Sequence, residues 1–288
     1  MRPLSKWPVE MRQRITGVFT DIDDTLTTAG AITPDALEAL ANLQTAGLRV
    51  IAITGRPVGW CEALMQINPI LGTIVAENGS VALINDKNGI QVSSIGHSLL
   101  SKLYQQDDLT RRQNAQRMQQ VAARVLREVP EAALSRDGGG RETDLAFDYN
   151  EHLQLPPATV QRILAILQRE GMHTTVSSIH IHGCFGEFDK WRGACWLARE
   201  LWGLDLATAL DEWLFVGDSG NDQAMFQHFT HSVGVANIGR FLPQLAFKPT
   251  YVAEGARGAG FAEVARAVLS ASPRGEDPGR QKDRAAWR

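Results

Sequence analysis

Three carboxylates near the N-terminus stand close enough together to bind a cation or to take part in group transfer. Asp21, Asp23 and Asp24 occupy three of the four positions 21–24. Because Asp21 and Asp23 are two residues apart, an extended chain would place them on one face. Carboxylates this close repel one another unless a cation or a shared proton lies between them. An aspartate-rich turn that closes a strand is the alternative for this segment alone.

An apolar run precedes the carboxylates and is typical of a buried strand. Ile15, Val18 and Phe19 are β-branched or aromatic residues, which favour strands. A buried strand does not tolerate unpaired charge, so the carboxylates are expected past its carboxyl end. In an open α/β sheet this end borders the crevice in which ligands bind.

Polar groups also follow two other predicted strands and open one predicted helix. Thr54 ends the strand predicted at 48–54, the sequence Gly-Asp-Ser-Gly-Asn-Asp at 217–222 follows the strand predicted at 213–216, and Lys190 opens a helix. Taken singly, these are ordinary turns and a solvated lysine. Together, at one edge of a parallel sheet, they predict a phosphoryl-transfer site. Carboxylates would hold Mg²⁺ there, and a lysine and a hydroxyl would hold the transferring group.

The elements that must position these groups alternate between strands and helices. Thr33 and Pro34 are typical of a helix start, and apolar residues at a period of 3.6 continue that helix to about residue 46. A second helix is predicted at 58–66 and a strand at 72–76. Strand–helix–strand units of this length predict right-handed crossovers and a parallel sheet, and hence an α/β fold.

The middle of the chain departs from this alternation and favours an α+β module. It contains a helix rich in Arg and Gln at 110–128 and a loop with three consecutive glycines at 138–140. The composition of the last residues predicts disorder. The predicted parts are a core at 14–84 and 186–270, an inserted module at 85–185, hinges near Leu83–Asn85 and Gly183–Gly186, and a disordered tail at 271–288.

In this order, the polar segments resemble the four motifs of the haloacid dehalogenase (HAD) superfamily. Asp21–Thr25 matches the motif Asp-x-Asp-x-Thr, Thr54 the hydroxyl residue after a strand, Lys190 the lysine before a helix, and Gly217–Asp222 the motif Gly-Asp-x-x-Asn-Asp. The inserted module between the second and third motifs resembles the class IIB (C2-capped) branch, which includes sucrose-phosphatase, mannosyl-3-phosphoglycerate phosphatase and phosphomannomutase. The resemblance implies a HAD-like Rossmannoid core with a parallel sheet and an inserted α+β cap domain.

The resemblance also implies roles for the core residues. Asp21 would be the nucleophile that becomes phosphorylated, and Asp23 the general acid and then the general base. The side chains of Asp21 and Asp218 and the backbone carbonyl of Asp23 would hold Mg²⁺. Thr54 and Lys190 would grip the phosphate.

Four further positions complete the expected core site. Gly55 and Asn221 would lie on the phosphate side, and Asp222 would be a close partner of the residues that touch the metal or the phosphate. Asp24 departs from the family pattern, because these enzymes commonly have glycine there. Its carboxylate would either strengthen metal binding or cap the following turn, and we favour the cap.

Candidate substrate contacts in and near the inserted module carry weaker signals. Arg141 and Glu142 follow the three glycines and could contact a polyhydroxyl or anionic substrate, although a solvated hairpin is an equal alternative. Asn78 lies in the segment Ala76–Gly79, which resembles the class IIB branch. The alternation His180-x-His182-x-Cys184 favours a strand face directed at the active-site cleft. It does not favour zinc, because residues two apart on a strand are about 7 Å apart, too far for three of them to share one ion at about 2 Å.

The overall composition narrows the class of protein. The chain has 288 residues, 44% of them hydrophobic, and a net charge of −3, so no bulk charge favours nucleic acid or an anionic membrane. No apolar run reaches the roughly 18 residues of a membrane span, and residues 1–14 contain no apolar secretory signal. Three widely spaced cysteines favour reduced thiols and a cytoplasmic location. Oligomeric state is not readable from this sequence.

The function expected from these observations is that of a Mg²⁺-dependent phosphatase. Its substrate would be a small phosphorylated metabolite, with a sugar phosphate as the first choice, and the reaction would pass through an aspartyl-phosphate. A phosphomutase of the same branch is the alternative within enzymes; it would need a sugar bisphosphate activator. A phospho-accepting module like a response-regulator receiver domain is the alternative from another class, but it lacks an inserted cap.

Overall fold

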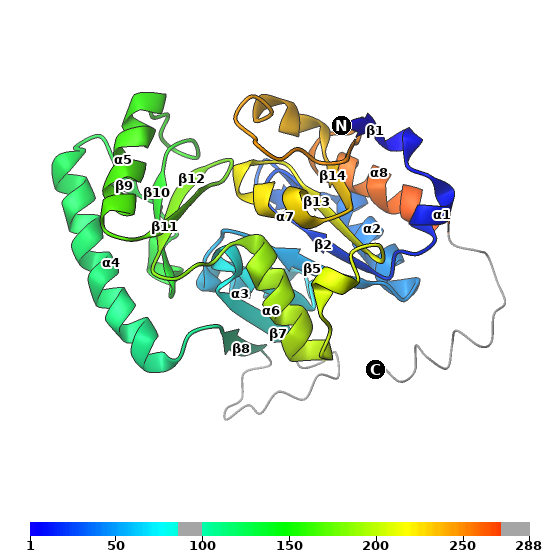
Figure 1. Cartoon of the computed structure of the whole chain (residues 1–288), viewed down its shortest axis with the longest axis horizontal. Helices are drawn as coiled ribbons and strands as arrows, with labels where there is room; N and C mark the ends of the chain where they lie inside the picture. The colour runs from blue at the N-terminus through cyan, green and yellow to red at the C-terminus, as the bar shows by residue number, and fades with distance from the viewer. Residues whose placement is uncertain (86–99, 272–288) are drawn as a thin grey trace.

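The computed structural model describes residues 1–85 and 100–271. It consists of a large sheet with helices on both faces and a smaller α+β unit beside it (Figure 1). Apart from residue 271, the tail for which disorder is predicted lies outside the described part of the chain. None of the described helices is both long and apolar enough to cross a membrane.

The large sheet has nine strands in the described part of the chain. In chain order they are β1 (Arg2–Pro3), β2 (Gly17–Thr20), β5 (Arg49–Ile53), β6 (Thr73–Ala76), β7 (Val81–Asn85), β8 (Leu100–Tyr104), β13 (Trp213–Gly217), β14 (His231–Gly234) and β15 (Tyr251–Val252). Their spatial order is β1-β15-β14-β13-β2-β5-β6-β7-β8, and all neighbours are parallel except β6–β7 and β7–β8.

Strand β2 lies at the point where the order of the parallel strands reverses. The chain continues from β2 to β5 on one side, through a small ribbon of β3 (Thr27–Thr28) and β4 (Ala31–Ile32), and much later adds β13 on the other side. At such a point the connections diverge above and below the sheet and leave a crevice at the carboxyl ends of the strands. Asp21 follows β2 directly and therefore stands at this crevice.

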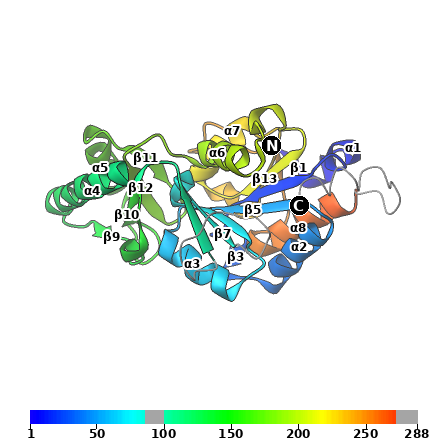
Figure 2. The same ribbon diagram turned by 90° about the horizontal axis from the view of Figure 1, so that it is seen from below.

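Helices cover both faces of the large sheet (Figure 2). After the short α1 (Val9–Arg12), the helices α2 (Pro34–Thr45), α3 (Val58–Ile67) and α8 (Arg257–Leu269) pack on one face, and α6 (Lys190–Trp202) and α7 (Gln223–His228) on the other. Pro34 stands in the first turn of α2, where a missing amide costs no helical hydrogen bond. The predicted α/β core with a mainly parallel sheet is therefore confirmed.

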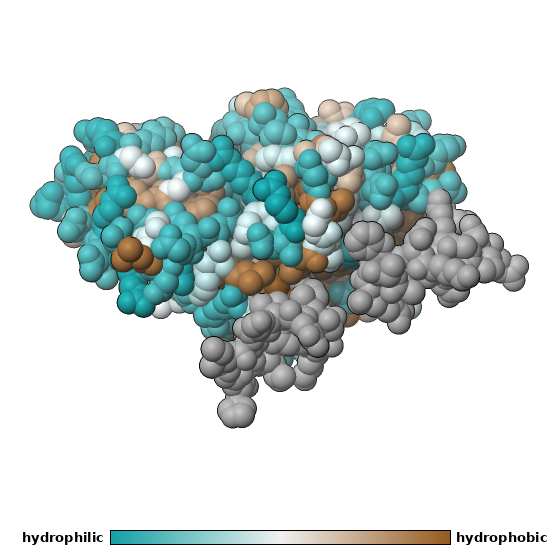
Figure 3. Space-filling model, turned by 60° about the horizontal axis from the view of Figure 1, so that its bottom comes forward, coloured by the Kyte–Doolittle hydropathy of each residue, from teal (hydrophilic) through white to brown (hydrophobic). Residues whose placement is uncertain are grey.

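The smaller unit, residues 108–184, is called the cap below. Its sheet is antiparallel in the order β11-β12-β10-β9, with strands β9 (Ala133–Leu134), β10 (Asp144–Asp148), β11 (His173–Val176) and β12 (His180–Cys184). Two helices, α4 (Asp108–Glu128) and α5 (Pro157–Arg169), pack on one face of this sheet around a separate apolar core. On the face shown in Figure 3, hydrophilic residues cover most of the cap surface.

Alternation along the cap strands directs polar side chains away from the cap helices. Phe147 and Ile181 belong to the apolar core beneath α4 and α5. Since successive side chains of a strand point to opposite faces, Asp144, His180 and His182 lie on the other face. This face meets the carboxyl ends of the core strands (Figure 1), as the alternation His180-x-His182-x-Cys184 predicts.

The inserted unit begins later in the chain than the sequence pattern predicts. Strand β8 pairs with β7 in the large sheet, so residues 100–104 belong to the core although the sequence pattern assigns them to the inserted module. Residues 83–85 lie inside β7, which is paired on both sides, and a hinge there is therefore wrong. The described connections between core and cap are 105–107 and 185–189. A short apolar run indicates a strand but not the sheet that it joins.

Candidate active site

Asp21 and Lys190 form the buried centre of the crevice. Oδ1 of Asp21 accepts a hydrogen bond from Nζ of Lys190 at 2.5 Å, and Oδ1 of Asp222 accepts one from the same ammonium at 2.6 Å. Burial raises the pKa of Asp21 to about 7, although Lys190 opposes the shift. Burial alone would lower the pKa of Lys190, but the two carboxylates outweigh it and raise that pKa. The lysine therefore remains an ammonium beside the candidate nucleophile.

A third carboxylate, Asp218, completes a group that fits a divalent cation. Oxygen atoms of Asp21, Asp218 and Asp222 all lie within 4.8 Å of one another. Burial raises the pKa of Asp218 well above its usual range, and its Oδ1 has no hydrogen-bond partner among the described residues. Three buried carboxyl groups thus share one buried ammonium, Lys190, and a further cation would offset the negative charge that all three carry when they are ionised. Carboxylate oxygens are the ligands that Mg²⁺ prefers.

Asp222 supports this centre without offering a free oxygen. Its Oδ2 accepts hydrogen bonds from the backbone amides of Asp218 and Ser219 at 2.8 and 3.0 Å, and its Oδ1 is held by Lys190. A Cβ at Gly217 would lie 2.5 Å from Oδ2 of Asp222, so this tight turn requires glycine. Asp222 therefore shapes the loop that carries Asp218, and Asp21 and Asp218 are the better metal ligands.

Asp23 is held by Arg56, a residue that the sequence pattern does not single out, because its segment is typical of an ordinary turn. Nε and Nη2 of Arg56 bind both oxygens of Asp23 at 2.9–3.1 Å. The same guanidinium reaches two cap residues, Asp137 at 3.2 Å and Glu151 at 2.8 Å. Arg56 thus joins the candidate acid–base residue to the cap. Its place directly after Thr54 and Gly55 is the signal available in the sequence.

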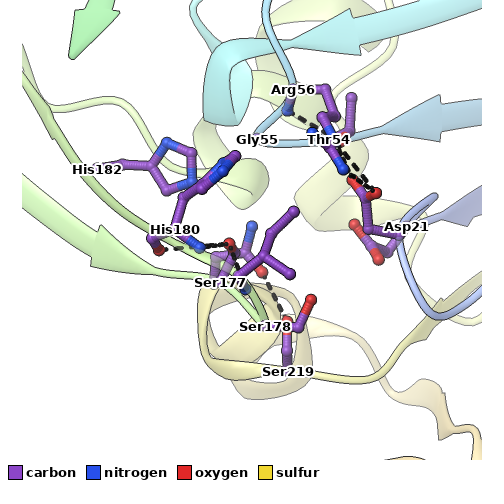
Figure 4. A pocket seen from close by; sticks show the side chains of 12 residues that line it. Asp21, Thr54, Gly55, Arg56, Ser177, Ser178, His180, His182 and Ser219 are labelled. Atoms are coloured by element: carbon purple, nitrogen blue, oxygen red, sulfur yellow. Dashed lines mark hydrogen bonds and ion pairs between the residues drawn. The ribbon is translucent and has the colours of Figure 1, made fainter. Parts of the chain in front are cut away.

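The cap covers a small cavity above these groups (Figure 4). In the figure, Thr54, Arg56 and Asp21 lie on the core side, and Ser177, His180 and His182 come from the cap. The cavity volume of about 10 Å³ holds about one water molecule, so the cavity as it stands has no room for a sugar phosphate. Its lining residues are Asp21, Asp23, Thr54, Gly55, Arg56, Ser177, Ser178, Ile179, His180, His182, Ser219 and Asn221.

The residues predicted for the core site meet at this place, together with His180, which is predicted as a substrate contact of the inserted module. Asp21, Asp23, Thr54, Gly55, Asn221 and His180 line the cavity, and Lys190, Asp218 and Asp222 lie in the buried centre at Asp21. Asn78 adopts a left-handed backbone conformation with φ of 54° and accepts a hydrogen bond from Nδ2 of Asn221 at 3.0 Å. It is thereby linked to the cavity wall through Asn221.

Arg141 and Glu142 do not line the cavity. The guanidinium of Arg141 is buried and donates to the carbonyl of Gly55 at 2.9 Å and to Asp144 at 2.8 Å. The carboxylate of Glu142 accepts hydrogen bonds from Lys102 and Tyr104 on the edge strand β8. Both side chains therefore connect the cap to the core, and the structure does not place them at a substrate.

Glu77, which follows β6 in the core, holds the start of β10 in the cap. Its carboxylate accepts hydrogen bonds from the backbone amides of Glu142, Thr143 and Asp144 and from the amide of Val58. Burial raises the pKa of Glu77 to about 7, with Asp144 adding to the shift. The carboxylate of Glu77 therefore connects the core to the cap through buried hydrogen bonds. The sequence signal is its place beside Asn78 in the segment Ala76–Gly79.

The Glu77→Gln variant is expected to lower the free energy of unfolding by about 1–3 kcal/mol, the usual cost of leaving buried hydrogen-bonding groups unsatisfied. The carboxylate of Glu77 now accepts hydrogen bonds from backbone N–H groups. The glutamine side chain would turn its own NH₂ group toward some of them, so that donors would face donors. Urea unfolding at pH 8 measures the change. The control is Glu62→Gln, which alters a half-exposed pair with Lys102 and should cost about 0.5 kcal/mol or less. Equal urea unfolding midpoints for Glu77→Gln and Glu62→Gln would contradict the stabilising role of the Glu77 carboxylate between core and cap.

Asp24 does not belong to the carboxylate centre. Its φ of 57° lies in the left-handed region, which glycine adopts freely and aspartate tolerates. Its carboxylate pairs with Arg240 and Arg257 at 2.6 and 2.9 Å. The side chain of Asp24 is therefore not the turn cap that we favoured from the sequence. Its ion pairs hold the loop after β2 against the segments that carry Arg240 and Arg257.

Comparisons with known proteins agree with this fold. A family model described as haloacid dehalogenase-like hydrolase matches residues 18–119. A curated phosphoglycolate phosphatase from Methanothermobacter thermautotrophicus is 26% identical over 257 residues, 88% of this chain and 98% of that protein. The structure of sucrose-phosphatase from Synechocystis, in complex with sucrose and phosphate, matches with a TM-score of 0.62 and 14% identity over 89% of this chain and 98% of that one. A sugar phosphatase of HAD subclass IIB matches with a TM-score of 0.56 and 15% identity over 88% and 97%.

Proposed function

We propose that this protein is a haloacid dehalogenase-like hydrolase, and that it is a Mg²⁺-dependent phosphatase that hydrolyses sugar phosphates through an aspartyl-phosphate. Hydrolysis of a phosphoric monoester is supported by the family model and by the curated relative. The proposed metal dependence and the proposed mechanism rest on the buried centre. There, Nζ of Lys190 donates to Oδ1 of Asp21 at 2.5 Å, and Oδ1 of Asp218 has no hydrogen-bond partner among the described residues. A centre of this kind can present a carboxylate to a phosphorus atom and neutralise the charge that develops there.

The proposed reaction has two steps that use Asp21 and Asp23. A carboxylate oxygen of Asp21 attacks phosphorus, the bond to the leaving oxygen breaks, and Asp23 gives that oxygen a proton. Asp23 then takes a proton from a water molecule, whose oxygen attacks phosphorus, and the bond between Asp21 and phosphorus breaks to release phosphate. Lys190 and the hydroxyl of Thr54 hold phosphate oxygens. Mg²⁺, held by Asp21, Asp218 and the backbone carbonyl of Asp23, would neutralise charge on the transferring group.

The cap residues that line the cavity, and could bind the rest of the substrate, include no arginine or lysine. The cap contributes Ser177, Ser178 and two imidazoles to the cavity. Arg56 is the one arginine or lysine in the lining of the described cavity, and three carboxylates already bind it. A carboxylate substrate such as phosphoglycolate would need a cationic partner, whereas the hydroxyls of a sugar do not. The cavity therefore favours sugar phosphates, and phosphoglycolate, named for the curated relative, is the second candidate.

The proposal predicts Mg²⁺-dependent hydrolysis of an aryl phosphate and of hexose 6-phosphates by the purified protein. EDTA should lower both rates at least about 100-fold, because the uncompensated carboxylates would then repel the phosphate. Mg²⁺ should restore the rates, and Ca²⁺ should not, because its longer bonds and higher coordination number misplace the nucleophile. Rates measured without any sugar bisphosphate separate a phosphatase from a phosphomutase, which needs that activator. Full activity in EDTA would contradict the metal assignment.

A further inference from the structure

His182 on the cap strand β12 is a buried histidine with one unsatisfied nitrogen. Its side chain lines the cavity and is 4% exposed. Nδ1 lies 3.0 Å from Oδ2 of Asp144, whereas Nε2 has no hydrogen-bond partner among the described residues. Buried polar atoms of native proteins are rarely left without a partner, so this nitrogen requires an explanation.

The surroundings of His182 determine which nitrogen carries the proton. Burial opposes ionisation of Asp144, but Arg141 and His182 outweigh it and lower the pKa of that carboxyl, so Asp144 is a carboxylate that can only accept. Nδ1 of His182 therefore donates to it. Burial lowers the pKa of His182 to about 4, which leaves the ring neutral near pH 7. In a neutral ring protonated on Nδ1, Nε2 is a hydrogen-bond acceptor.

The acceptor edge of the ring faces the core beside the proposed phosphate site. A Cβ on Gly55 would lie 3.0 Å from Cε1 and Nε2 of His182 and 3.1 Å from Nδ2 of Asn78, so a residue larger than glycine would crowd this edge. Gly55 directly follows Thr54, whose hydroxyl is proposed to hold the phosphate. Figure 4 shows the ring extending from its strand toward Gly55. A group attached to the phosphate through its leaving oxygen would therefore pass close to Nε2 when the cap moves to admit it.

We infer that Nε2 of His182 accepts a hydrogen bond from a hydroxyl of the substrate's leaving group and thereby selects hydroxylated over carboxylated phosphate monoesters. A hydroxyl can donate to this nitrogen, whereas an ionised carboxylate has no proton to donate and would be repelled by its lone pair. Sites that bind a substrate hydroxyl in this way discriminate against analogues that lack it, because the buried partner is then left unsatisfied. This inference rests on the proposed phosphatase function, since it assigns a specificity residue to that site.

The test compares substrates that differ in one group. Values of kcat/KM are measured for glucose 6-phosphate, its monodeoxy analogues, phosphoglycolate and an aryl phosphate. In the wild-type protein, one monodeoxy analogue should lose about 10- to 100-fold relative to glucose 6-phosphate, the usual effect of one unsatisfied buried group. The His182→Phe variant should lose the same factor in the ratio of glucose 6-phosphate to aryl phosphate, and removal of that hydroxyl should then cost it nothing more.

Two further variants show whether the acceptor atom, Nε2 of His182, is responsible for the preference for glucose 6-phosphate. His182→Gln, which can present an acceptor oxygen, should recover part of the lost ratio. His173→Phe changes an exposed histidine on the neighbouring strand β11 and should leave the ratio at its wild-type value. The hydroxyl contact is overturned if His182→Phe lowers kcat/KM equally for all four kinds of substrate, or if no monodeoxy analogue is discriminated against by the wild-type protein.

A spectroscopic measurement separates this inference from the proposed function. With ¹⁵N-labelled histidine in the Asp21→Asn variant, which should not turn substrate over, glucose 6-phosphate should shift the Nε2 resonance of His182 and phosphoglycolate should not. A wild-type protein that hydrolyses none of the esters would overturn the proposed function, yet a shifted Nε2 resonance would still support the hydroxyl contact. An unchanged resonance at saturating glucose 6-phosphate would overturn the contact.

Discussion

The Asp21→Asn variant is expected to lose turnover by at least about 10⁴-fold while it keeps its fold. An amide is not a competent nucleophile for phosphorus, and removal of the nucleophile in enzymes that form covalent intermediates costs factors of this size or larger. The fold should persist because Lys190 retains its bond to Asp222 at 2.6 Å. Replacing one of three crowded carboxylates by a neutral amide also removes repulsion within the buried group.

This variant is measured by steady-state hydrolysis of an aryl phosphate and by trapping of phosphorylated protein. The wild-type protein should yield an acid-stable, base-labile phosphoryl adduct, and the variant should yield none. The matched control is Asp211→Asn, a substitution at a side chain that is 58% exposed and pairs only with exposed Arg14 among the described residues. Near-normal turnover in Asp21→Asn, with an unchanged urea unfolding midpoint, would show that Asp21 is not the nucleophile.

The Asp23→Asn variant is expected to lose about 10²–10⁴-fold in kcat on sugar phosphates, the usual effect of removing a positioned acid–base group. A sugar alkoxide leaves poorly without a proton, whereas an aryl oxide needs less assistance. The loss should therefore be smaller for aryl phosphates with acidic leaving groups. Asn retains one acceptor oxygen for Arg56, so the contact with the guanidinium is weakened rather than abolished.

The dependence of the rate on the leaving group checks this role. A series of phosphate monoesters with leaving groups of increasing pKa is compared in the wild-type protein and in Asp23→Asn. The logarithm of the rate should fall more steeply with leaving-group pKa in the variant, because no proton compensates the charge on the departing oxygen. Parallel dependences, with an equal loss across the series, would show that Asp23 supports the structure of the site and does not transfer the proton.

Local chemistry makes much of the core site readable from the sequence. Carboxylates directly after an apolar run cannot lie within a buried strand, and this alone places Asp21 at a strand end. The alternation of strands and helices requires a parallel sheet, and parallel strands bring their carboxyl ends to one edge. Residues far apart in the chain, such as Thr54, Lys190 and Asp218, can therefore be assigned to one site.

Contacts between core and cap depend on three-dimensional placement that no local pattern carries. Arg56 meets Asp137 and Glu151, which lie 81 and 95 residues further along the chain, and nothing beside Arg56 indicates these partners. The same holds for Glu77, whose carboxylate binds amides 65–67 residues away. A polar residue in a predicted loop is compatible with solvent, substrate or a partner across an interface.

The sequence by itself determined where Asp21, Lys190 and the segment 217–222 stand, because each is set by a strand or helix end and a few neighbouring residues. The tertiary structure decided which sheet β8 joins and that Arg141 and Glu142 connect cap and core. It also decided that Nε2 of His182, at the cavity, has no hydrogen-bond partner in the part of the chain that the structure describes. These outcomes depend on strand pairing and on packing between distant segments. Their energies come from partners that the chain brings together only when it folds.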